Sequence, residues 1–60
     1  MRKVAKDIAT GLFERLRAGE IDRIGIDEIR TAISDDMRSG DYHPDILEYA
    51  VTRAVVEMAL

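Results

Sequence analysis

The 60-residue chain contains no cysteine and no tryptophan, one proline, one histidine and only three aromatic side chains. Without cysteine it forms no disulfide and no cysteine–zinc site, two devices that stabilise many very small domains. The single histidine, His43, leaves little acid–base or metal-binding chemistry near neutral pH. We therefore expect no catalytic residues, no metal site and no cofactor, and we expect that the protein is not an enzyme.

Long apolar runs are also missing from the chain. No stretch reaches the roughly 18 to 20 apolar residues that a membrane-spanning helix needs. Asp7 and Glu14 interrupt the segment that follows the basic start, which argues against a signal peptide. The expectation is a cytoplasmic protein that does not act on membranes.

Acidic residues outnumber basic ones by twelve to nine, so the net charge is −3. This sign is opposite to that of a general nucleic-acid binder. The charge is distributed unevenly, because residues 1–23 carry a net +2 and residues 24–60 a net −5. The acidic part predicts either good solubility or a basic partner.

Apolar residues recur at helical spacing in three segments, and each segment has end signals. The first runs from Val4 to Leu16 in an i, i+4 pattern and is followed by Gly19. The second begins after Gly25, a suitable N-cap, and carries isoleucines on one stripe. The third begins at Pro44, with His43 as its cap. We predict an all-α fold, a single three-helix domain over residues 1–60 with helices near 3–18, 26–39 and 44–60.

The two joints between these helices resemble each other, 21 residues apart. In each, a glycine (Gly19 or Gly40) is followed by an acidic residue and then an apolar one. The similarity predicts one left-handed glycine cap used twice, although unrelated helix ends also look alike. A short extended segment over residues 23–26 is the alternative to a plain loop there.

The third predicted helix is unusually apolar. Eleven of the fifteen residues from Ile46 to Leu60 are apolar, and the four polar ones are predicted to share one narrow strip. Two short helices cannot cover such a helix, so we predict that it pairs with its own copy in a two-fold dimer. Ala50 and Ala54 would allow a close approach. The predicted interface comprises Ile46, Leu47, Ala50, Val51, Ala54, Val55 and Met58.

These observations favour a binding function. We expect a small non-enzymatic protein-binding regulator, inhibitor or adaptor that acts as a helical homodimer and has a second protein as partner. In a rival explanation, a different protein alone covers the third helix. In another, the chain remains a monomer with an apolar end.

The main alternative is a DNA-binding transcriptional regulator or an antitoxin-like protein. Residues 33–47, centred on Arg38-Ser39-Gly40-Asp41-Tyr42, resemble the helix–Gly–x–Tyr–helix joint of ribbon-helix-helix antitoxins, and similar strings occur in anti-sigma factors and GntR-type regulators. The antitoxin resemblance implies a base-reading strand before the first helix, where this chain has only Arg23-Ile24-Gly25-Ile26. Nucleic acid is thus a less favoured partner, and its candidate contacts are Arg2, Lys3, Lys6, Arg15, Arg17 and Arg23.

Overall fold

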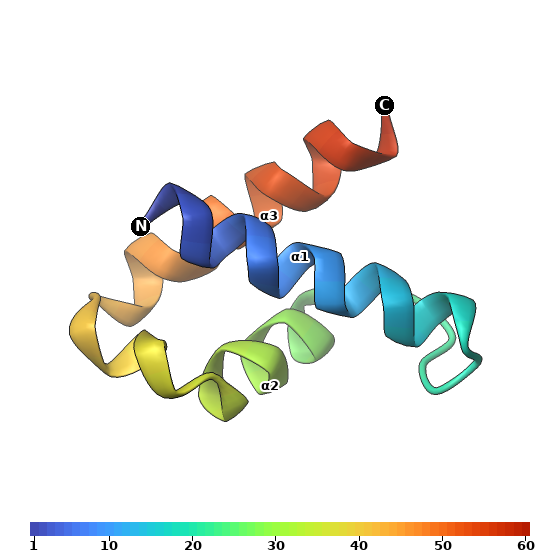
Figure 1. Ribbon diagram of the computed structural model, residues 1–60, viewed down its shortest axis with the longest axis horizontal. Helices are drawn as coiled ribbons and strands as arrows, with labels where there is room; N and C mark the ends of the chain where they lie inside the picture. Colours follow the sequence, from blue (N-terminus) through green and yellow to red (C-terminus); the bar gives the residue numbers. More distant parts are fainter.

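The computed structural model describes residues 1–60 and contains helices only. Helix α1 spans Arg2–Arg17, α2 spans Ile26–Asp35, the short 3₁₀ helix η1 spans Met37–Asp41, and α3 spans Pro44–Ala59. Each α-helix contacts the other two, and the C-terminal turns of α3 lead away from the rest of the molecule (Figure 1). The predicted all-α, three-helix architecture is confirmed, and residues 23–26 form no strand.

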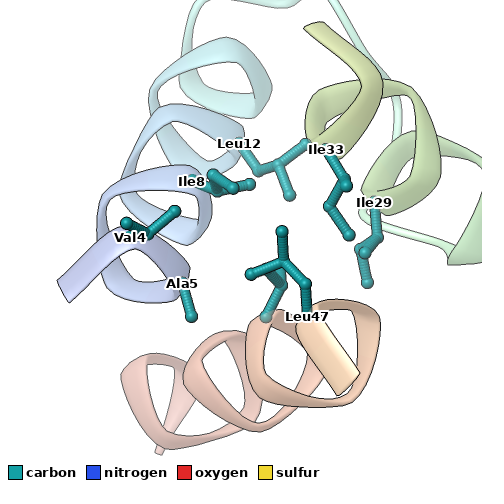
Figure 2. Close-up of a cluster of buried hydrophobic side chains, with 8 residues drawn as sticks. Val4, Ala5, Ile8, Leu12, Ile29, Ile33 and Leu47 are labelled. Carbon is teal, nitrogen blue, oxygen red and sulfur yellow. The ribbon is translucent and has the colours of Figure 1, made fainter. Parts of the chain in front are cut away.

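The core lies where the three helices meet. Leu47 points from α3 towards Leu12 of α1 and the two isoleucines of α2 (Figure 2). On α1 the buried residues recur every three to four positions, as an amphipathic helix requires. The hydrophobic cluster comprises Val4, Ala5, Ile8, Leu12, Ile29, Ile33, Leu47 and Val51.

The predicted caps at the starts of α2 and α3 are confirmed. The backbone N–H of Gly25 donates to Oε1 of Glu28 at 2.8 Å, which is the N3 half of a capping box, the only half that a glycine N-cap allows. At the start of α3, Nδ1 of His43 accepts a hydrogen bond from the backbone N–H of Asp45 at 3.2 Å. Pro44 follows as the first helical residue, where its missing N–H carries no cost.

The prediction that the second helix continues to residue 39 is wrong. Helix α2 ends at Asp35, and Asp36 adopts an extended conformation with ψ of 120°. The Asp36 carboxylate then accepts a hydrogen bond from the backbone N–H of Arg38 at 2.8 Å, which caps the start of η1. Short acidic side chains compete with the helix in this way, so Asp36 ends one helix and begins another.

The two interhelical glycines do not have the same role, so the prediction of a repeated cap is wrong. Gly19 has φ of 79°, the only positive φ in the chain. The N–H of Glu20 donates to the carbonyl of Arg15 and that of Gly19 to Leu16, the two hydrogen bonds of a Schellman motif. Gly40 lies inside η1 with a negative φ, because α2 has already ended at Asp35.

Candidate protein interaction surface

The structure divides the seven residues of the predicted interface between the core and the surface. Leu47 and Val51 are fully buried within the chain itself. Ala50, Ala54 and Val55 are half-buried, whereas Ile46 and Met58 are exposed. The proposed dimer contact remains a prediction. In this structure a partner could reach five of the seven residues, all except Leu47 and Val51.

A second row of side chains lies on the opposite face of α3 from Leu47 and Val51. Its members follow one another at alternating spacings of three and four residues, and its apolar members are between 53% and 100% exposed. We call this row the exposed seam; it comprises Ile46, Tyr49, Arg53, Val56 and Leu60. The predicted interface included only Ile46 from this row. The alternating spacing was the available signal in the sequence, since it is the a and d spacing of a heptad.

A hollow of about 610 Å³ adjoins the exposed seam where the N-terminal turns of α1 approach α3. Its α1 side carries two apolar and two basic residues. On α3 it extends from Ile46 to Met58, just over three turns, past two alanines that leave space beside the helix. The lining residues are Met1, Arg2, Ala5, Lys6, Ile46, Tyr49, Ala50, Arg53, Ala54, Glu57 and Met58.

The polar residues of α3 form two strips, so the prediction of one strip is wrong. Glu48 accepts a hydrogen bond from Nε of Arg30 on α2 at 2.7 Å, and its carbonyl accepts from the Thr52 hydroxyl at 2.8 Å. On the other side of α3, Arg53 and Glu57 form an i, i+4 ion pair at 3.6 Å beside the hollow. At 100° per residue, Thr52 and Arg53 point in very different directions, although they are adjacent in sequence.

The candidate nucleic-acid contacts fall into separate groups along the molecule. Arg2 and Lys6 line the hollow at the start of α1, with exposed Lys3 on the same turns. At the other end of α1, Nε of Arg15 lies 3.9 Å from the Glu20 carboxylate. Arg17, the last residue of α1, and Arg23, in the loop between α1 and α2, are also exposed. The six basic residues therefore form no single patch.

An ion-pair network connects η1 to α1 at the surface. Nη1 of Arg38 lies 3.0 Å from Oδ2 of Asp7 on α1, and its Nη2 lies 2.9 Å from Oδ2 of Asp36. The side-chain hydrogen bond from Arg38 lowers the pKa of Asp36 below its usual value. The same bond, together with that to Asp7, raises the pKa of Arg38. This network positions η1. The charge of Arg38 is paired with two carboxylates of the same chain.

No group of three or more histidine and carboxylate side chains is arranged to hold a metal ion. Helices that combine the length and the hydropathy needed to cross a bilayer are absent from the fold. Comparison with protein-family models, curated proteins and solved structures found no match to this chain.

Proposed function

We propose that this chain is a small non-enzymatic protein-binding regulator, inhibitor or adaptor that self-associates through the exposed side of α3. The observation that carries the proposal is the concentration of large exposed apolar side chains on one helix. Of the eight in the chain, five lie on α3 or at its end: Ile46, Tyr49, Val56, Met58 and Leu60.

The free energy of burial supports an interface at this position. A large aliphatic side chain gains roughly 1.5–3 kcal/mol when it moves from full exposure to full burial. Scattered exposed apolar residues are ordinary, but a contiguous row of them on one helix is typical of an interaction site. Tyr49 and Arg53, two residue types enriched in interfaces, lie in the middle of the row.

The size of the protein favours self-association for an independent reason. A chain of about 60 residues buries only about 60% of its unfolded surface, and this one has nine buried residues and no disulfide. The C-terminal turns of α3 extend beyond the other helices, so they have few intramolecular neighbours (Figure 1). A partner along α3 would stabilise these turns by adding contacts on their exposed side.

Sedimentation equilibrium or light scattering at micromolar concentration tests the proposal. The expected mass is twice the 6.8 kDa of the chain. Val56→Glu should give a folded monomer, because a charge on the exposed seam is tolerated in water but not in an apolar contact. Met37→Glu is the matched control, since Met37 is exposed on η1 and should leave the mass unchanged. A wild-type chain that stays monomeric would overturn the proposed self-association.

A nucleic-acid function is the second candidate, and the N-terminal basic group supports it. Arg2, Lys3 and Lys6 are exposed within two turns of α1, and none of them forms an ion pair. A heparin column distinguishes the two functions. Retention at low salt that disappears at moderate salt would favour phosphate binding, whereas direct flow-through at low salt would count against it.

A further inference from the structure

We infer that α3 pairs antiparallel with α3 of a second copy, through the exposed seam and in one specific register. In this register Ile46 packs against the partner's Val56, and Tyr49 packs against the partner's Arg53. The inference rests on the proposed self-association and adds to it the orientation of the helices and the residues in contact. It also differs from the interface predicted from the sequence, which centred on the core-facing side of α3.

The spacing of the exposed seam fits a helix–helix contact. Ile46, Tyr49, Arg53, Val56 and Leu60 are separated by three, four, three and four residues, so they fill successive a and d positions of a heptad. The core-facing Leu47 and Val51 already contact α1 and α2. The two faces of α3 are therefore independent, and a helix can bind the seam without disturbing the core.

Arg53 determines the orientation of the two helices. It occupies the central a position, with apolar seam residues on both sides of it. In a parallel pair in register, each Arg53 would lie beside its own copy, and two like charges would meet in an apolar contact. In an antiparallel pair, an a position faces a d position, so Arg53 faces a different residue.

Two antiparallel registers use four seam residues of each chain, and their contacts differ. The first places Tyr49 against the partner's Arg53, so a guanidinium lies on an aromatic ring, and two-fold symmetry forms this contact twice. The second places Arg53 against the partner's Val56, where the guanidinium would lose water against an aliphatic side chain and meet no aromatic face. Only in the first register does every seam residue in the contact face a side chain of compatible chemistry.

The surroundings of the exposed seam are compatible with this register. Glu57 already lies 3.6 Å from Nη2 of Arg53 within the same helix, so a carboxylate stays beside the guanidinium at the edge of the contact. Ala50 and Ala54 present small side chains to the hollow beside α1. The flank of the partner helix can therefore enter the hollow of about 610 Å³ while its seam meets the exposed seam.

Cysteine cross-linking tests the orientation without interference, because the natural chain has no cysteine. The double variant Ile46→Cys with Val56→Cys should form a disulfide-linked dimer on mild oxidation. Each single variant should not, since equivalent positions would lie about 15 Å apart along an antiparallel pair, beyond the reach of a disulfide. Thr31→Cys, on the exposed side of α2, is the control for random collision.

Each cross-linking outcome has a distinct consequence. Cross-linking of both single variants would show a parallel pair and overturn the inference. Efficient cross-linking of Tyr49→Cys with Leu60→Cys, but not of the first double variant, would show the second register and also overturn it. A dimeric wild type without any of these cross-links would refute the seam contact alone, whereas a monomeric wild type would refute the proposed function as well.

Substitution of the central pair gives a second test. Arg53→Ala should weaken dimerisation by about 5- to 30-fold, the loss of two cation–π contacts per dimer, while Tyr49→Phe should preserve it. Sedimentation equilibrium measures the change, and far-UV circular dichroism verifies that each variant is helical. An equal loss from Tyr49→Phe would contradict the stacking contact.

Discussion

Single residues decide how the first joint of this chain is built. Gly19 has φ of 79° and ends α1 with a Schellman motif, whereas Gly11 lies in the middle of α1, and a Cβ added there would meet no atom within 4 Å. The same residue type is therefore required at one position and only tolerated at the other. The sequence predicts the left-handed cap at Gly19, and the positive φ confirms it.

Alanine substitutions should separate these two glycines. Gly19→Ala should destabilise the fold by about 1–2 kcal/mol, because a Cβ opposes the left-handed conformation. Gly11→Ala should stabilise it by about 0.5–1 kcal/mol, since alanine loses less conformational entropy in a helix. Urea unfolding followed by circular dichroism measures both changes. Equal effects of the two substitutions would contradict the assigned conformations.

Leu47 should be among the residues on which folding depends most. It is fully buried between α1 and α2, so Leu47→Ala should lower the free energy of unfolding by about 2–5 kcal/mol. A loss of this size is comparable to the whole stability expected for a small domain. Met37→Ala is the control, because Met37 is 97% exposed and its truncation should leave the melting curve nearly unchanged. Similar melting curves for the two variants would place Leu47 outside the core.

At the level of elements, the three helices are predictable because their end signals and apolar spacing agree. Pro44 and His43 mark the start of α3 correctly, and Gly25 with Glu28 marks the start of α2. The end of α2 is not predictable in the same way, since Ile33 and Met37 share one helical stripe in the sequence. Asp36 interrupts that stripe, because its carboxylate accepts a hydrogen bond from the backbone N–H of Arg38. This hydrogen bond belongs to the folded turn.

The capping of η1 by Asp36 should depend on pH. Because Arg38 lowers the pKa of Asp36 below 3.8, the native state favours the carboxylate. Its contribution to stability is present above the pKa of the unfolded state and is lost as the pH falls through the lower folded-state value. Asp36→Asn preserves a capping oxygen but removes the charge, so it should lower the melting temperature at pH 7 and not at the lowest pH.

Thermal melts of both proteins from pH 7 to pH 2 measure this difference, which should also shrink with added salt. Asp35→Asn is the control, since no ion pair involves Asp35. A difference between wild type and Asp36→Asn that does not change with pH would show that the charge of Asp36 contributes nothing.

At the level of the whole molecule, stability and self-association should be coupled. If α3 binds a second copy only when folded, the melting temperature should rise with protein concentration, by roughly 3–6 °C per tenfold increase for a domain of this size. Val56→Glu should remove this dependence, because the variant melts as a monomer. Calorimetry or circular dichroism over a hundredfold concentration range tests it. A wild-type melting temperature that is independent of concentration would argue against the coupling.

The sequence alone determines that this chain forms three helices, because helical spacing and capping residues are local properties. It also predicts a surplus of apolar side chains on α3, since eleven of fifteen residues there are apolar. Only the tertiary structure decides which of them face the core. Ile46 and Leu47 are adjacent and similar in hydropathy, yet docking of α1 and α2 buries Leu47 and leaves Ile46 exposed. The exposed seam consists of α3 side chains that α1 and α2 leave uncovered.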